Sequence, residues 1–239
     1  MSHVMTPQRR QRGRPQVRSD EATRHLIAEA ARGVFIACGY SAANMDQVAK
    51  TAAVSKKTLY RLFPTKAELF RASIADRIDS FILGLDEERV AKLPAEGALV
   101  RILTEYGRLT LAADTTALQK LVLAESDRFP ELAADFYRGA VIATQRVFVR
   151  RLEQLCREGA IEIDDLDETA GMLRGMMIFE PSRGAMYGQK ALPSMAEIEN
   201  RATRCARLFL DGCRKAGDRI SPSAKHRAQV VGKSPTEPC

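Results

Sequence analysis

The stretch from Asn44 to Arg61, N-M-D-Q-V-A-K-T-A-A-V-S-K-K-T-L-Y-R, contains two short helical patterns separated by only a few residues. Asn44 is a suitable N-cap for the first pattern, whose short apolar face is formed by Met45, Val48, Ala49 and Ala52. Ser55 can cap the second pattern, and Val54 and Leu59 are spaced as a hydrophobic staple around that cap. The stretch therefore predicts a helix, a tight turn and a second helix.

The second of these helices should be anchored from one side and exposed on the other. Ala53 is small enough for the close turn, Val54 is expected to enter the core, and Leu59 should fix the helix from beneath. The residues left on or near the exposed side are Lys56, Lys57, Thr58, Tyr60 and Arg61. A single helix fits the major groove of DNA, where Lys or Arg can donate to guanine and Thr can offer its methyl group to thymine. Tyr60 and Lys66 are better placed as phosphate contacts. The alternative is an ordinary helical corner with a solvated basic face.

The flanking sequence is helical on both sides. A helix is expected from about Ser19 to a stop at Gly39, with a buried face of Ile27, Ala30, Ala31, Val34, Phe35 and Cys38. After Pro64, the sequence Thr65-Lys66-Ala67-Glu68 is a capping box that starts another helix. Further helices are predicted at about 66–86, 96–113, 115–127, 131–158, 166–187 and 195–215. Alternating strand patterns are nearly absent, so the fold class is all-α.

Positive charge is concentrated in the first quarter of the chain. The net charge is +7, and residues 1–66 hold twelve Lys or Arg against four acids, whereas the rest holds twenty-five against twenty-six. Such segregation is expected when one part of a protein meets a polyanion. Nucleic acid and an anionic membrane surface both qualify, and a merely soluble basic surface explains the sign of the charge but not its distribution.

Several functional classes are disfavoured. The five cysteines are odd in number and never spaced C-x-x-C, which is typical of a reduced, cytoplasmic protein rather than of a disulfide or zinc framework. No apolar run approaches the roughly 18 residues of a membrane span, and the basic amino end lacks the apolar region of a signal peptide. The motifs G-x-x-x-x-G-K, H-E-x-x-H, G-x-S-x-G and G-x-G-x-x-G are absent, so neither an enzyme nor a cofactor is expected.

Residues 39–70, G-Y-S-A-A-N-M-D-Q-V-A-K-T-A-A-V-S-K-K-T-L-Y-R-L-F-P-T-K-A-E-L-F, resemble the amino-terminal signature of the TetR family of transcriptional regulators. Residues 121–137, L-V-L-A-E-S-D-R-F-P-E-L-A-A-D-F-Y, resemble the AefR-like carboxy-terminal subgroup. The sequence departs from the family pattern at Ala43, where a hydroxyl residue is frequent, at Ala53, where glycine is usual, and at Lys57, where glycine is frequent. Base preference therefore cannot be transferred from relatives.

The resemblance implies a cytoplasmic, homodimeric repressor that binds a double-stranded, pseudo-palindromic operator and is released by a small, largely apolar effector. Together with the composition of the two ends, the resemblance leads to four expected segments: a flexible basic arm over 1–18, a helix-turn-helix domain over 19–66, an effector-binding and dimerisation domain over 67–217 and a disordered tail over 218–239. From the arm and the helix pair together, the expected DNA contacts are Arg12, Arg14, Asn44, Ser55, Lys56, Lys57, Thr58, Tyr60, Arg61 and Lys66. A redox- or metal-responsive regulator that acts through its cysteines is the alternative, although Cys38 and Cys205 lie on apolar stripes and are expected to be buried.

Three further features carry expectations with open alternatives. Arg12-Gly13-Arg14-Pro15 resembles the core of an AT-hook, which lies in a narrow minor groove, but it can also be a solvated basic leader. The candidate effector-pocket residues, for each of which core packing is the alternative, are Tyr106, Leu109, Leu121, Phe136 and Met172. The candidate dimer residues, which can equally be monomer core, are Met172, Met176, Met177 and Phe179 in one segment and Ile198, Ala202, Cys205, Leu208 and Phe209 in the next.

Overall fold

The computed structural model describes residues 19–213, and every regular element in that range is a helix. This confirms the all-α prediction. The chain forms two compact units, one ending at Asp76 and the other beginning at Arg77. None of the helices within residues 19–213 has the length and apolar character needed to cross a bilayer.

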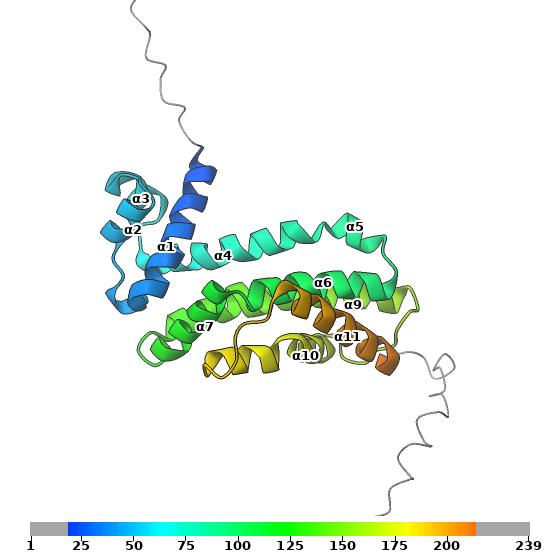
Figure 1. Cartoon of the computed structure of the whole chain (residues 1–239). Coiled ribbons are helices and arrows are strands. Elements are labelled where there is room, and N and C mark those ends of the chain that lie inside the picture. Colours follow the sequence, from blue (N-terminus) through cyan, green and yellow to red (C-terminus); the bar gives the residue numbers. More distant parts are fainter. Residues whose placement is uncertain (1–18, 214–239) are drawn as a thin grey trace, which may run out of the picture. The chain divides into compact units, whose positions relative to one another are not determined.

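The first unit is built from α1 (Asp20–Ala42), α2 (Met45–Thr51), α3 (Lys56–Leu62) and the beginning of α4 (Lys66–Leu85) (Figure 1). The predicted caps are confirmed at each start. The side chain of Asn44 accepts a hydrogen bond from the Gln47 amide at 2.8 Å, and Ser55 accepts one from the Thr58 amide at 3.0 Å. Thr65 accepts one from the Glu68 amide at 3.1 Å. These caps satisfy amides that have no partner within their own helix, so each short helix begins at a defined residue.

An aromatic cluster forms the centre of the first unit. Phe35 and Tyr40 from α1 meet Phe70 from α4, with ring centroids 5.5–5.6 Å apart. Leu59 is completely buried and fixes α3 as predicted. Two expectations were wrong: Val54 is only half-buried, and Cys38 is exposed. Cys38 immediately precedes the break at Gly39 (φ 80°), and its sulfur accepts a hydrogen bond of 3.5 Å from the side-chain amide of Gln47 on α2.

The turn between α2 and α3 contains a residue with positive φ that is not glycine. Ala53 has φ 50°, and the turn is closed by hydrogen bonds from the Val54 amide to the Ala49 carbonyl at 3.0 Å and from the Ala53 amide to the Lys50 carbonyl at 3.2 Å. This is the Schellman pattern, in which the left-handed residue is usually glycine because a Cβ is disfavoured there.

We therefore expect Ala53→Gly to raise the free energy of unfolding by about 1 kcal/mol, since the left-handed conformation costs an L-residue about that much. Thermal unfolding followed by circular dichroism would measure the change. The control is Ala52→Gly, because Ala52 has φ −76° and gains nothing from glycine. The melting temperature of Ala52→Gly should fall below that of the wild type. Equal changes in melting temperature for Ala53→Gly and Ala52→Gly would contradict the strain argument.

Within its described part, the second unit contains the end of α4, seven further α-helices and a π-helical segment. Their bounds are α5 Glu87–Ala91, α6 Ala95–Thr110, α7 Ala113–Glu125, α8 Pro130–Phe136, the π-helix Tyr137–Ile142, α9 Ala143–Arg157, α10 Leu166–Met186 and α11 Met195–Cys213. The predicted helices are present to within a few residues. The short α5 was not predicted, and the helix expected over 131–158 changes to π-helical geometry in its first half.

Helix α6 occupies the centre of this unit and packs closely against α11. A side chain at Gly107 would come within 2.6 Å of Met177 on α10 and 2.9 Å of Ile198 on α11, so glycine permits the close approach of these helices. The buried residues of α11 include Ile198, Ala202, Cys205 and Phe209. Most of the stripe considered for dimerisation is therefore core of the chain itself, whereas Leu208 points outward and is 66% exposed.

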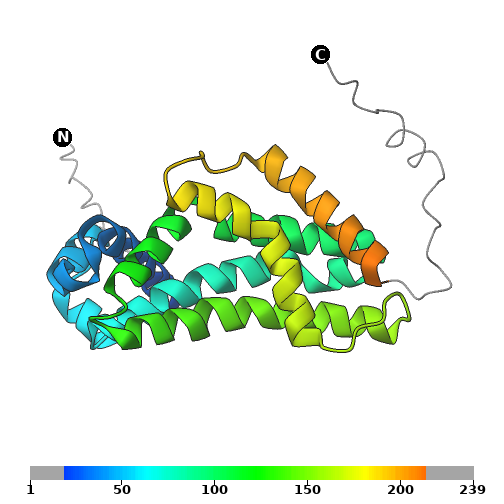
Figure 2. The same ribbon diagram turned by 90° about the horizontal axis from the view of Figure 1, so that it is seen from below.

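Helix α10 is bent at its centre (Figure 2). Pro181 lies inside the helix and has no amide hydrogen to donate to the carbonyl of Met177. Arg201 of α11 supplies the missing donors: its Nε donates to the Met177 carbonyl at 2.7 Å, and its Nη2 donates to the Met176 carbonyl at 2.7 Å. A side chain from the neighbouring helix thus compensates for the proline.

Candidate nucleic-acid interface

Helix α3 presents a polar and basic face on the first unit. Leu59 and Leu62 are buried beneath it, while Lys57, Tyr60 and Arg61 are exposed, as the sequence predicts. Tyr60 is 47% exposed, which leaves its hydroxyl available to a partner. Lys57 makes no hydrogen bond or ion pair with any residue in the described range 19–213. Its ammonium is therefore free to contact a base or a phosphate.

Two other basic residues of α3 are held by carboxylates. Lys56 pairs with Asp46 of α2. Arg61 donates two hydrogen bonds to Asp20 of α1, each of 2.8 Å. The hydrogen bond from Arg61 is the main reason that the pKa of Asp20 lies below its ordinary value. These pairs orient the two cations at the surface, and a phosphate that contacts either cation would compete with its carboxylate.

The remaining polar residues of the predicted set have local roles as well. The oxygens of Asn44 and Ser55 serve as helix caps, and the hydroxyl groups of Ser55 and Thr58 are hydrogen-bonded at 2.8 Å. Thr58 is half-buried, whereas Asn44 and Ser55 are exposed. All three lie at the beginnings of α2 and α3, so they position these helices even where they make no contact with DNA. Arg12 and Arg14 lie outside the described residues.

Lys66, which the sequence suggests as a phosphate contact, also binds backbone atoms of the first unit. Its ammonium donates to the backbone carbonyls of Tyr40 at 2.7 Å and of Ser41 and Ala43, both at 3.1 Å. The same ammonium lies 4.7 Å from the centroid of the Tyr40 ring. Lys66 therefore stabilises the end of α1 through these three carbonyls, and its role as a phosphate contact stays a prediction.

Asp20 and Asp46 are members of this surface that sequence reasoning missed. Asp20 lies 41 residues before Arg61, and Asp46 lies 10 residues before Lys56. Neither separation is a helical i, i+3 or i, i+4 spacing, so no local pattern points to these pairs. Only the packing of three helices brings them together.

The candidate pocket residues of the second unit differ in how far they are buried. Tyr106 and Leu109 are buried, Leu121 and Phe136 are half-buried, and Met172 is 60% exposed on α10. Around Tyr106, the structure shows a polar network rather than an open apolar space. Arg174 donates from Nε to the Tyr106 hydroxyl at 3.2 Å, from Nη1 to Gln145 at 2.7 Å and from Nη2 to Thr144 at 2.9 Å. The assignment of these residues to an effector pocket stays a prediction.

The first unit thus presents one helix of a capped, tightly turned helix pair, and this geometry defines the helix-turn-helix class of DNA-binding proteins. The family models agree with it along most of the chain. Residues 27–73 match the model of the bacterial regulatory proteins of the tetR family, and residues 97–212 match the carboxy-terminal domain of AefR-like transcriptional repressors. The chain belongs to the TetR family of transcriptional regulators.

Individual relatives support the same assignment. The transcriptional activator FasR of Mycolicibacterium smegmatis is 41% identical over 66 residues, which cover 28% of this chain and 30% of FasR. A TetR-family regulator structure from Mesorhizobium loti covers 83% of this chain and all of its own, with a TM-score of 0.71 and 23% identity. The flavonoid-responsive regulator FrrA covers 82% of this chain and 99% of its own, with a TM-score of 0.62 and 28% identity.

Proposed function

We propose that this protein is a homodimeric repressor that binds a pseudo-palindromic operator and leaves it when a small, largely apolar molecule binds the second unit. The observation that carries the DNA-binding part is the exposed face of α3, where Lys57, Tyr60 and Arg61 stand above the buried Leu59. A helix anchored in this way can enter the major groove with its basic side chains toward the base edges.

Exposed apolar side chains on the last two helices support the dimer. Phe179 of α10 is 62% exposed, and Leu208 of α11 is 66% exposed. Met172 of α10 is also exposed, at 60%. Large exposed apolar side chains are suited to a two-fold interface, which buries the same surface on both subunits. A two-fold dimer would place two α3 helices on half-sites about 34–36 Å apart.

Release by an effector is supported by a relative of this chain. FrrA, which is 28% identical and has the same fold, is named for its response to flavonoids. The cysteine-based alternative has less support, because Cys205 is buried and burial raises the pKa of its thiol. Within residues 19–213, no three His, Cys, Asp or Glu side chains are grouped so as to hold a metal ion.

A footprint on the DNA flanking the protein's own gene would test the operator-binding part. Protection of a pseudo-palindrome by purified protein is the expected result, with loss of protection when the effector is added. Uniform weak protection that disappears at moderate salt would show only non-specific phosphate binding and would contradict sequence-specific operator recognition.

Lys57→Ala should relax the sequence preference of the protein as well as weaken its binding. Loss of a base contact costs about 1–3 kcal/mol at the affected position and much less elsewhere. The measurement is the Kd for the operator and for a set of single-base variants of it. Lys50→Ala is the control, because Lys50 is also an exposed lysine but lies on α2. Identical relative affinities of wild type and Lys57→Ala across all operator variants would contradict a base-reading role for Lys57.

A further inference from the structure

Arg151 is a buried cation on the apolar face of α9. Its neighbours along this face, Val147, Phe148, Leu152 and Leu155, are all buried, and Arg151 itself is only 5% exposed. A guanidinium retains its charge inside a protein, and removing it from water is costly unless hydrogen bonds and a counter-charge replace the solvent. The environment of Arg151 should therefore contain acceptors for its N–H groups.

The described residues do not supply these acceptors. Nε and Nη1 of Arg151 are buried and have no hydrogen-bond partner within residues 19–213. An oxygen of Glu158 lies 3.9 Å from Nη1, which is within ion-pair range but beyond hydrogen-bonding distance. That oxygen already accepts a hydrogen bond of 2.8 Å from Gln154. Arg174, in contrast, uses three of its nitrogens in hydrogen bonds. Arg77 of the same unit also has a buried Nε without a partner, but its Nη2 donates to a carboxylate oxygen of Asp114 at 3.1 Å.

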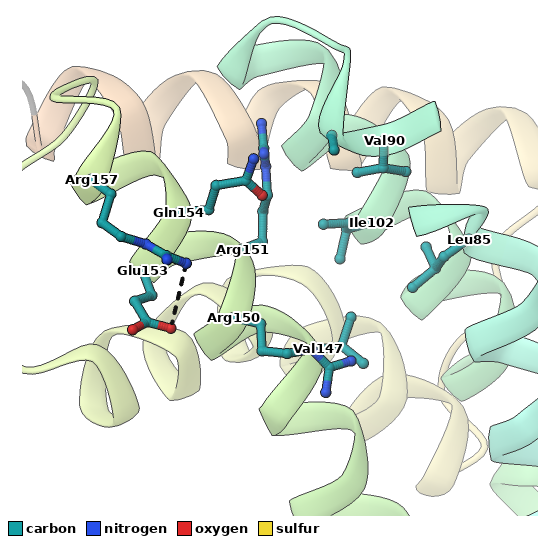
Figure 3. Close-up of a pocket in the computed structure, with 10 residues that line it drawn as sticks. Leu85, Val90, Ile102, Val147, Arg150, Arg151, Glu153, Gln154 and Arg157 are labelled. Carbon is teal, nitrogen blue, oxygen red and sulfur yellow. Dashed lines mark ion pairs between the residues drawn. The ribbon is translucent and has the colours of Figure 1, made fainter. Parts of the chain in front are cut away.

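A pocket of about 270 Å³ opens beside this guanidinium (Figure 3). Arg151 and Gln154 extend from α9 toward it, and Leu85, Val90 and Ile102 line it from α4, α5 and α6. The lining also includes Arg150, Arg157 and one acid, Glu153, so arginines outnumber carboxylates there. Arg157 and Glu153 are paired at 3.9 Å and are both largely exposed, which leaves Arg151 as the deeply buried charge.

We propose that this pocket binds a small organic carboxylic acid, whose carboxylate accepts hydrogen bonds from Arg151 and whose apolar body lies against Leu85, Val90 and Ile102. A single buried cation matches the single charge of a monocarboxylate. The volume of about 270 Å³ lies just below the range of about 300–1,000 Å³ that is typical of ligand pockets, which favours a short aliphatic or aromatic acid. None of the five pocket residues predicted from the sequence lines this pocket.

The ligand-binding claim stands on the pocket, and only its regulatory meaning rests on the proposed function. Binding is therefore measured on the full-length protein without DNA, by titration calorimetry with benzoate and hexanoate and with the neutral benzamide and hexanamide. The acids should bind and the amides should not. Arg151→Met should raise the Kd of the acids by about 10- to 100-fold, the range for lost hydrogen bonds to a charged group.

A matched variant separates a ligand-binding arginine from a structural one. Arg157→Met also removes an arginine of the pocket lining, but one that is exposed and paired, so its Kd for the acids should stay within about threefold of the wild-type value. Without ligand, Arg151→Met should melt at or above the wild-type temperature, because it removes a buried, unmatched charge. No binding of either acid to the wild type would overturn the proposal, and so would equal binding of acids and amides.

The regulatory consequence is tested separately on the operator. Acids that bind the wild-type protein should also displace it from the footprint, and Arg151→Met should remain on the DNA in their presence. Failure to find an operator would contradict the proposed function, but the calorimetric evidence for ligand binding would still stand. If the protein protects its operator but does not bind the acids, only the proposed carboxylate site is contradicted.

Discussion

Replacing Lys66 by methionine is expected to lower the free energy of unfolding of the first unit by about 3 kcal/mol, because hydrogen bonds to a charged group each contribute about 1.5–3 kcal/mol when a partner is left unsatisfied. The variant would leave the carbonyls of Tyr40, Ser41 and Ala43 without the ammonium that now binds them. It would also remove the contact between this cation and the Tyr40 ring. Denaturant unfolding and amide hydrogen exchange within α1 would measure the loss.

Lys50→Met provides the control for this prediction. Lys50 is an exposed lysine of α2, so its replacement should change stability by no more than about 0.5 kcal/mol. One outcome would favour a phosphate contact over the structural role of Lys66. A Lys66→Met protein that is as stable as wild type but binds DNA poorly would restore the phosphate role and contradict the structural one.

Arg174→Ala is expected to destabilise the second unit by about 3 kcal/mol. Its side chain links α10 to Tyr106 of α6, to Gln145 of α9 and to Thr144, whose hydroxyl in turn donates to the Ala140 carbonyl at 2.7 Å. Truncation removes these bonds, leaves buried polar groups unpaired and opens a cavity beside Tyr106. Burial also raises the pKa of the Tyr106 hydroxyl, so this group is a neutral partner for the guanidinium.

The control for Arg174 lies on the same helix. Arg183 is half-exposed and pairs with the similarly exposed Glu180, a type of ion pair that contributes about 0–1 kcal/mol. Arg183→Ala should therefore unfold close to the wild-type temperature in a calorimetric scan. Equal melting temperatures for Arg174→Ala and Arg183→Ala would show that the network around Tyr106 adds little to stability.

Local sequence signals account for three of the helix starts in the first unit. Asn44, Ser55 and Thr65 are caps that act within three residues, and the structure shows each of their hydrogen bonds. The face of α3 follows from the same local logic, since Leu59 fixes which side is buried. Lys66 shows the limit of this reasoning, because its partners lie more than 20 residues away at the end of α1.

The short α5 escaped prediction because five residues carry too little periodicity to be recognised. Arg151, on the other hand, had a readable signal. It lies on the same face of α9 as the buried residues Val147, Phe148, Leu152 and Leu155, so the helical period predicts that its side chain is buried too. A charged residue inside such a series indicates either a compensating partner or a ligand. Which of the two applies depends on neighbours from α4, α5 and α6 that only the fold brings together.

The bend of α10 also has a genetic consequence. A frameshift or stop codon ahead of Arg201 would remove more than the last helix, since the carbonyls of Met176 and Met177 would lose the donors that compensate for Pro181. The same truncation would uncover the face of α6 that α11 covers. We expect such shortened gene products to be degraded by cellular proteases rather than to persist as dominant-negative competitors for the operator.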